Sequence, residues 1–353
     1  MNESLPTVTV LIAARPQQEL IKAVIASRAL DYPANKLDIL VARGRHPSVQ
    51  RNAAIKTARG ELIYFLDDDS VPGPSSLRRA VDYFTDPAVK MVGGPNGCPP
   101  DAPPLEQLFA VVLGSWLAFG PSRARYTPIG QKRQTGEKEL ILCNLVARRE
   151  ALLELGGFNE ALFPNEENAL MDELQKRGGK LIYDPELLVH RRPRGTMKAF
   201  AKMLVTYGRG RGEQVRLHPT IGSLPNFVPA LLCLYFAALV ILLGLALIMP
   251  ELRRATFWLL TPVLAYVVAL LAQAAALAPR FGVLKSALAV PLIVISNILY
   301  GCGIWRGLFT TFKPAEQRTV EAQVVLEPVP LQVPPDPSLH AERGLAQGPE
   351  AVR

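Results

Sequence analysis

The fold of this chain is decided by the stretch ELIYFLDDD, which runs from Glu61 to Asp69. Its apolar residues are typical of a buried β-strand, yet the strand ends in three adjacent carboxylates. Adjacent acids repel one another and are poor strand formers, so a strand that delivers them to its end requires a cation there. Hard oxygen ligands suit Mg²⁺ or Mn²⁺. We interpret the run as a metal site at a strand end, with a solvated acidic loop as the alternative.

The segments around this run alternate between strand and helix patterns. The predicted strands are Thr7–Ala14, Leu37–Ala42, Glu61–Leu66, Val89–Gly93 and Lys180–Tyr183, and the predicted helices are Gln18–Ala29, Ser48–Ala58, Pro74–Phe84 and Ala169–Arg177. Such alternation predicts an α/β domain with a mostly parallel sheet. Ligands of these sheets bind at the carboxyl ends of the strands. We therefore expect Ala14, Arg15 and the three aspartates on one rim.

A second acidic pair, Glu166 and Glu167, lies just before the last of these predicted helices. Acids in a first turn favour the helix dipole, and for this pair taken alone that structural role is the simpler interpretation. Farther along, His190 closes a short apolar run that follows the strand Lys180–Tyr183. A single histidine in such a place is usually structural. Neither feature identifies a site by itself.

Three long apolar segments follow the α/β region: Pro225–Met249, Ala255–Ala278 and Ser286–Trp305. Each reaches the roughly 20 residues that a helix needs to cross a bilayer. Length favours three crossings. The third segment contains Pro291 and Asn297, so a re-entrant or interfacial path stays open. The predicted organisation is a domain over residues 1–216, a membrane module over 217–313 and a disordered tail over 314–353.

Charge and cysteine content narrow the class of protein. The formal net charge is +8, and eight basic residues gather just before the first apolar segment: Arg191, Arg192, Arg194, Lys198, Lys202, Arg209, Arg211 and Arg216. Such a belt marks the cytosolic side of a membrane and attracts anionic lipid. Aromatics are sparse there, so we predict no nucleic-acid partner. The four cysteines have no paired spacing, which argues against a disulfide framework or a zinc site.

The ordered set of motifs resembles a known family. After a β-branched first strand come Gln50-Arg51-Asn52, the aspartate run, Gly156-Gly157-Phe158, the glutamate pair and His190. This order is similar to that of the inverting family 2 glycosyltransferases of GT-A fold, and most of all to membrane-anchored exopolysaccharide enzymes of the succinoglycan type. The resemblance covers residues 7–216. It implies a Rossmann-like GT-A domain that transfers a sugar from a nucleotide-sugar donor to a lipid-linked or glycan acceptor.

The resemblance also implies roles for individual residues. Asp69 would bind Mn²⁺ or Mg²⁺ at the donor's phosphates, with Asp67 near the ribose or the metal and His190 closing the metal site. Glu167 would be the general base, although Glu stands where the family has Asp, which leaves Glu166 as the other candidate. The implied nucleotide-sugar-binding residues are Ala14, Arg15, Arg51, Asn52, Asp67 and Asp68.

One departure concerns the nucleobase. The family's second strand ends in an acid that contacts the base, whereas this strand ends at Ala42 and continues with Arg43 and Gly44. The donor nucleotide therefore stays unassigned, as do the sugar and the oligomeric state. Because Met1–Thr9 lacks a signal-peptide pattern, we expect a cytosolic catalytic domain on a multi-pass protein of a bacterial-type inner membrane. The alternatives are an inactive membrane-anchored scaffold of an assembly complex and a transport component.

Overall fold

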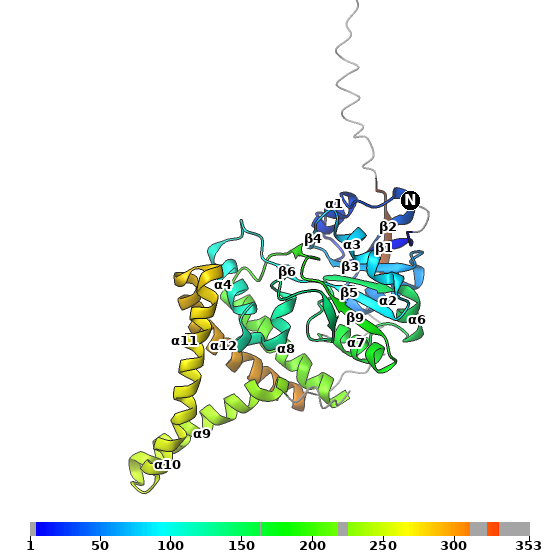
Figure 1. Cartoon of the computed structure of the whole chain (residues 1–353). Coiled ribbons are helices and arrows are strands. Elements are labelled where there is room, and N and C mark those ends of the chain that lie inside the picture. The colour runs from blue at the N-terminus through cyan, green and yellow to red at the C-terminus, as the bar shows by residue number, and fades with distance from the viewer. Residues whose placement is uncertain (1–4, 163, 218–224, 311–322, 332–353) are drawn as a thin grey trace, which may run out of the picture.

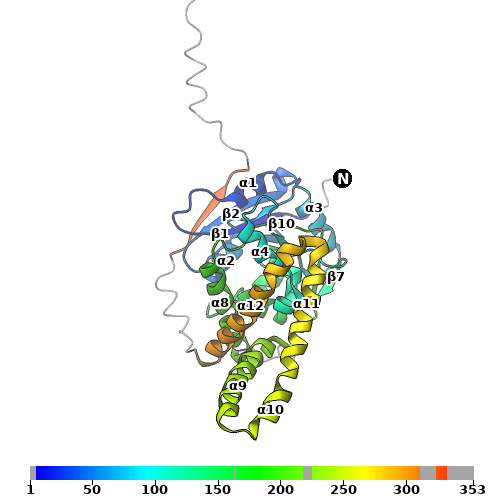
Figure 2. The same ribbon diagram turned by 90° about the vertical axis from the view of Figure 1, so that its left-hand side faces the viewer.

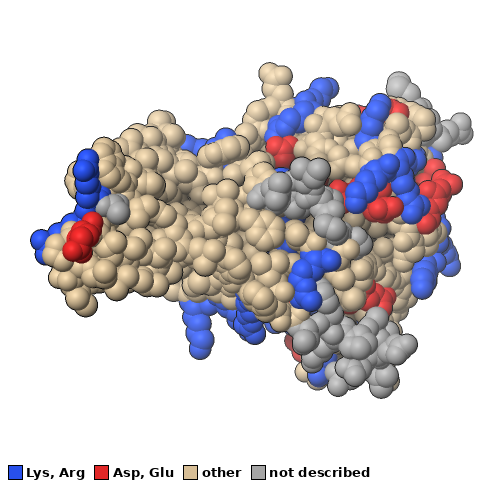
Figure 3. Space-filling model, turned by 90° about the horizontal axis from the view of Figure 1, so that it is seen from below, with Lys and Arg blue, Asp and Glu red and all other residues tan. Residues whose placement is uncertain are grey.

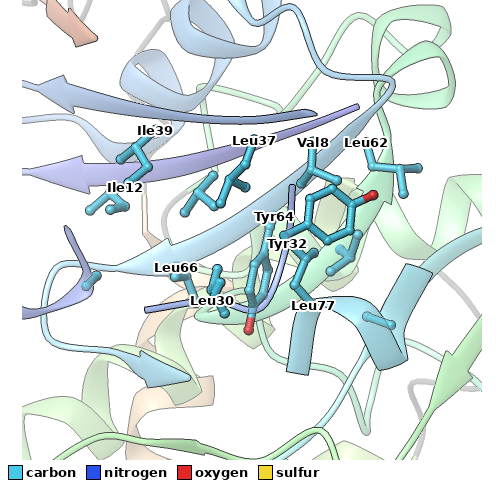
Figure 4. Packing of buried hydrophobic residues seen from close by; sticks show 14 of the residues in the cluster. Val8, Ile12, Leu30, Tyr32, Leu37, Ile39, Leu62, Tyr64, Leu66 and Leu77 are labelled. Carbon is cyan, nitrogen blue, oxygen red and sulfur yellow. The ribbon is translucent and has the colours of Figure 1, made fainter. Parts of the chain in front are cut away.

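The decisive stretch forms β3 (Leu62–Asp67), a buried strand near the middle of an eight-stranded sheet. The computed structural model describes residues 5–162, 164–217, 225–310 and 323–331. Alternate side chains of β3 enter opposite layers, as the period of two requires. Tyr64 packs on one face of the sheet, and Ile63 and Phe65 pack on the other. Figure 4 shows the first face, where Tyr64 lies among aliphatic side chains of the neighbouring strands.

The sheet mixes parallel and antiparallel pairs: β2, β1 and β3 pair in parallel, as do β5 and β9, whereas β8 in the middle and both edge strands pair antiparallel. Its order is β11-β2-β1-β3-β8-β5-β9-β7, and a three-stranded sheet has the order β4-β10-β6. The strands are β1 Val8–Ala14, β2 Leu37–Arg43, β4 Val71–Pro72, β5 Val89–Gly93, β6 Asn96–Gly97, β7 Arg133–Thr135, β8 Asn144–Arg148, β9 Lys180–Tyr183, β10 Val189–His190 and β11 Val325–Val329. The strands β1, β2 and β3 pair in parallel, which confirms the predicted α/β domain.

Helices cover the sheet and extend beyond it (Figure 1). They are α1 Lys22–Arg28, α2 Pro47–Thr57, α3 Ser76–Val81, α4 Pro104–Leu113, α5 Trp116–Phe119, α6 Arg149–Glu154, α7 Glu166–Lys176, α8 Met197–Leu217, α9 Val228–Ile248, α10 Leu252–Leu259, α11 Thr261–Phe281 and α12 Val283–Phe309. Short 3₁₀ turns cover Ala34–Lys36, Asp82–Thr85 and Gly120–Arg125. The predicted helix Gln18–Ala29 is wrong at its start, because Ile21 is extended and α1 begins at Lys22.

The sequence interpretation missed the central strand β8. It lies between β3 and β5 and runs antiparallel to both. The polar side chain of Asn144 obscured it, yet that side chain is buried for a structural reason. Asn144 accepts a hydrogen bond from the Tyr64 hydroxyl at 3.1 Å and donates to the Leu187 carbonyl at 2.5 Å. A satisfied buried amide can therefore sit within a strand.

Three of the described helical segments are long and apolar enough to cross a membrane: Pro225–Ile248, Leu252–Phe281 and Val283–Phe309. They match the three segments predicted from hydropathy. In both ribbon views α9 and α11 project from the α/β domain as a hairpin with α10 at its tip (Figures 1 and 2). Figure 3 shows a broad surface free of charge colouring between that tip and the domain.

The third helix differs from the other two. Its most apolar window is 44% buried by protein, against 11% and 12% for the windows in the hairpin. Its two ends contact parts of the chain outside the hairpin: Lys285 Nζ donates to Gln107 Oε1 of α4, and Arg216 of α8 donates to the Gly307 carbonyl. Glycines allow this packing, since a Cβ on Gly208 of α8 would lie 2.1 Å from the Tyr300 carbonyl.

The predicted disordered tail is wrong for one segment. Residues Val325–Val329 form β11, which pairs antiparallel with β2 at the edge of the main sheet. The β2 edge offers unpaired backbone groups, and the apolar side chains Val324 and Leu326 pack against the core. The predicted tail outside residues 323–331 is not among the described residues.

Candidate active site

The carboxyl ends of the parallel strands carry the predicted site. In the register of the sheet Ala13 of β1 lies opposite both Asp67 of β3 and Ala42 of β2. Gln50 of α2 fastens two of these ends together, because its Nε2 donates to the Ala14 carbonyl at 2.9 Å and to the Ala42 carbonyl at 2.6 Å. The strand ends therefore lie side by side as predicted, and the Gln50 side chain holds the ends of β1 and β2 together.

Two arginines neutralise the aspartates. Arg191 contacts Asp67 at 3.1 Å and Asp69 at 2.5 Å, and Arg51 contacts the second oxygen of Asp67 at 3.3 Å. Arg51 also donates to Glu166 at 2.9 Å, so one guanidinium joins the strand-borne acids to the helix-borne acid. The sequence predicts a cation beside the aspartates at the end of β3. In this structure the guanidinium of Arg191 occupies that place.

The glutamate pair opens α7. Its N-cap, Asn165, has φ 88°, a left-handed conformation that is uncommon for a residue other than glycine. Glu166 is 3% exposed, and burial raises its pKa to about 8; the charge of Glu167 adds to the shift and Arg51 opposes it. Among the described residues, Glu166 Oε2 and Asn165 Nδ2 are buried without a hydrogen-bond partner. Such atoms are costly unless a ligand or water satisfies them.

Asn52 supports the site from behind. Its side chain donates to the Phe158 carbonyl at 2.9 Å and accepts from the Phe158 amide at 2.8 Å. Gly157 has φ 85°, and a Cβ there would lie 2.3 Å from Asn52 Oδ1. Glycine in the Gly-Gly-Phe motif thus allows the side chain of Asn52 to hydrogen-bond the backbone that leads toward α7. The structure turns Asn52 toward this loop, whereas the resemblance implied a contact with the donor.

The site opens into a cavity of about 1410 Å³. Of the predicted residues, Ala14, Arg15, Arg51, Asp67, Asp68, Glu166 and Glu167 line it. The far end of the cavity reaches the membrane-type helices, where Leu232 of α9, Tyr266 of α11 and Asn297 of α12 contribute to the wall. Asn297 is 5% exposed and donates to the Tyr266 hydroxyl at 2.9 Å. One cavity therefore joins the carboxylates to polar groups within apolar helices.

The donor set fits a hard divalent cation in part. Asp67 and Asp69 supply only oxygen, and such ions often bind one or two carboxylates and complete their shell with substrate phosphates. His190 is exposed at the end of β10, opposite Val71 of β4. Within the described residues, no group of three or more His, Cys, Asp or Glu side chains is placed to hold a metal. Arg191 contacts Asp69 through Oδ1, and no contact of Oδ2 is recorded among the described residues.

Much of the predicted lipid-binding belt is used internally. Arg191 serves the aspartates, Arg192 binds Glu106 at 2.6 Å, and the buried Arg211 contacts Glu137 at 3.3 Å. Sequence alone gave no sign of these partners, which lie far away along the chain. Lys198 and Lys202 of α8 are exposed and lie one turn apart.

Comparison with known proteins agrees with this geometry. The family model described as "Glycosyltransferase like family 2" matches residues 2–206. The "Pre-mycofactocin glycosyltransferase" of Mycobacterium tuberculosis is 25% identical over 203 residues, which cover 54% of this chain and 40% of that protein. The alignment thus spans less than half the length of that curated relative.

Solved structures give weaker likenesses. The mannosyltransferase PcManGT from Pyrobaculum calidifontis, in complex with GDP-Man and Mn²⁺, is 18% identical with a TM-score of 0.45, over 83% of this chain and 88% of that one. S. aureus TarS 1-349 in complex with UDP is 12% identical with a TM-score of 0.40, over 58% and 65%.

Proposed function

Since the chain belongs to the glycosyltransferase-like family 2, we propose that it transfers a sugar from a nucleotide-sugar donor to an acceptor at a membrane. One observation supports the proposal most. Two strand-borne aspartates, two arginines and a helix-borne glutamate pair meet at the carboxyl edge of the sheet. A nucleoside diphosphate that leaves a sugar develops negative charge, and fixed cations at that place stabilise it.

The residues divide into two groups with different tasks. Arg51 and Arg191 provide positive charge on the donor side. When bound, Mn²⁺ or Mg²⁺ would be held by Asp69 with Asp67 and would add to that charge. On the acceptor side Glu167 takes the proton of the attacking hydroxyl. We prefer Glu167 to Glu166, because Arg51 occupies one oxygen of Glu166 and its pKa of about 8 keeps it protonated at neutral pH.

The same reasoning favours inversion. A single carboxylate base activates the acceptor hydroxyl for attack on the face opposite the leaving diphosphate, which inverts the anomeric carbon. The acceptor we propose is lipid-linked or a glycan, as in exopolysaccharide synthesis. The cavity supports this proposal because it runs from the glutamates to Leu232 and Tyr266. Polar groups within membrane-type helices, such as Asn297, are usually functional.

The arrangement of the helices leads to a proposal for topology. A strand that pairs with the main sheet lies on the same side of a bilayer as that sheet, so β11 requires an even number of crossings. We propose that α9 and α11 cross, and that α12 stays on the side of the catalytic domain, which is the cytosol. A reporter active only in the cytosol, fused after Arg353, should give a bright signal. A dark signal there, with a bright signal at Met1, would support three crossings.

Activity is tested on the purified full chain with a panel of nucleotide sugars, with and without Mn²⁺. A true donor at 100 times its Kd should stabilise the fold by about 2.7 kcal/mol. Donor turnover that depends on the divalent cation supports the enzyme. A second candidate is a catalytically inactive scaffold, favoured by the hold of Arg191 on both aspartates. The scaffold predicts neither stabilisation by any donor nor turnover.

A further inference from the structure

The C-terminal strand β11 is attached to the catalytic domain along both of its faces. Its register on β2 runs from Val325 opposite Arg43 to Val329 opposite Ile39. Leu326 packs against one core layer and Val329 against the other. Beyond the strand, Arg28 of α1 donates to the Pro330 carbonyl at 3.1 Å. These contacts fix β11 in a single register, so its side chains occupy defined places.

One side chain of β11 reaches the ligand-binding end of β2. Glu327 Oε2 accepts from Arg43 Nε at 2.7 Å, and the two side chains are 42% and 20% exposed. Arg43 is the residue with which β2 ends. The end of β2 thus carries a cation whose carboxylate partner comes from β11.

Arg43 then extends toward the loop that follows β1. Its Nη1 donates to the Gln18 carbonyl at 2.8 Å and to the Arg15 carbonyl at 3.3 Å. A guanidinium is planar and presents its donors in a fixed fork. Fixing Nε on Glu327 therefore also fixes the direction in which Nη1 points. Glu327 of β11 is thus linked through Arg43 to the backbone between residues 15 and 18.

The two loops that Arg43 joins both face the cavity. Arg15 and Pro16 line it from the end of β1, and Gly44, Arg45 and His46 line it from the end of β2. Residues at these strand ends are the ones a nucleoside meets in sheets of this type. Neither Arg43 nor Glu327 is part of the lining, so both act on the ligand only through the loops they hold.

We propose that β11 is a latch: Glu327 orients Arg43, Arg43 holds the loop of residues 15–18 against the end of β2, and the donor's nucleoside binds the surface so formed. Glu327 and Arg43 are positioning residues. The inference rests on the proposed function, because it takes the cavity to bind a nucleotide. It adds that the segment after the membrane helices sets nucleotide affinity.

The test is nucleotide binding by the full-length protein, with UDP and GDP as probes in Mn²⁺. Glu327→Ala should raise the Kd of the nucleotide that the wild type binds by about 1.5- to 5-fold, the range for an exposed ion pair. Arg43→Ala should raise it by roughly tenfold, because hydrogen bonds from a charged group to two carbonyls are also lost. The KM for donor should follow the Kd, and kcat should change little.

A double-mutant cycle distinguishes the latch from simple edge protection. In the Arg43→Ala background, Glu327→Ala should have no further effect on nucleotide Kd, because the glutamate acts only through the arginine. Val325→Ala is the matched control: it lies on the same face of β11, is 55% exposed and should leave the Kd unchanged. High salt should reduce the difference in nucleotide Kd between the wild type and Glu327→Ala, because salt screens the ion pair between Glu327 and Arg43.

The outcomes separate the two proposals. If the wild type binds neither nucleotide, the latch is overturned as a device for these nucleotides, whereas turnover with another nucleotide sugar would still support the proposed function. If the wild type binds and Glu327→Ala binds equally well, the latch is overturned and the function stands. If Glu327→Ala and Val325→Ala weaken nucleotide binding equally, β11 contributes only to the stability of the fold and the latch is overturned. Should Arg43→Ala not fold, Arg43→Lys keeps the charge without the fork and should weaken binding in the same direction.

Discussion

The acids of β3 and the acids of α7 carry the same charge but lie in different surroundings. Asp67 and Asp69 are 24% and 42% exposed and are shared by arginines, whereas Glu166 is 3% exposed. Exposed carboxylates can exchange one cation for another. A buried carboxyl is pushed toward its neutral form, and its pKa rises. Burial, more than residue type, therefore distinguishes the proposed cation-binding side, at the end of β3, from the proposed proton-handling side, at the start of α7.

The largest effect is expected at the open side. Asp69→Asn removes a charged oxygen that both Arg191 and a divalent cation would use, so transfer should be lost and donor binding should no longer depend on Mn²⁺. The fold should persist, because the side chain is 42% exposed. Asp38→Asn, an exposed aspartate on β2, is the control in the same assays. Wild-type turnover by Asp69→Asn in Mn²⁺ would refute the assignment of Asp69.

The open side was also the easier side to predict. The apolar run that ends at Asp67 is a local signal, and a parallel sheet brings strand ends together by topology. The partner Arg191 is distant in the sequence from Asp69, so no local pattern connects them. Because Arg191 stands among other basic residues, the sequence pattern predicts a lipid contact for it instead. Gln50 was missed as a support for the same reason: its partners are the backbone ends of two other strands.

Prediction failed differently at the elements that complete the sheet. The strand β8 contains the polar Asn144, whose buried side chain is satisfied by hydrogen bonds to Tyr64, Pro95 and Leu187, which come from elsewhere in the chain. The strand β11 contains Pro328, and prolines in a tail favour a prediction of disorder. An edge strand tolerates proline, because its outer backbone groups need no partner. Both strands depend on what they pair with, which composition does not reveal.

The next effect concerns the proton-handling side. Glu167→Gln should lower kcat by about 10²- to 10⁴-fold while leaving donor binding nearly intact, since a general base acts on the acceptor. Glu173→Gln, on the same helix in a surface pair with Arg177, should leave kcat unchanged. Steady-state kinetics with matched donor titrations make the comparison. An active Glu167→Gln beside an inactive Glu166→Gln would exchange the two roles.

The smallest effect tests burial itself, through stability and pH. The folded pKa of Glu166 is about 8, raised from 4.5, first by burial and then by the charge of Glu167. A carboxyl whose folded pKa is raised contributes stability that is fully present below its unfolded pKa and is lost as pH rises through the folded value. The wild type should therefore lose stability between pH 4.5 and about 8 relative to a variant that cannot ionise there.

Glu166→Gln supplies that variant, because glutamine keeps the size and the hydrogen-bonding capacity of the protonated acid. The difference in Tm between Glu166→Gln and the wild type should shift in favour of the variant as pH rises from 4.5 to about 8, and should be constant above that. Glu173→Gln, whose side chain is 45% exposed, should show no such trend. A flat difference across this range would mean that Arg51 keeps Glu166 ionised throughout. Glu166 would then be ionised like the aspartates of β3. The choice between Glu166 and Glu167 as general base would rest on geometry alone.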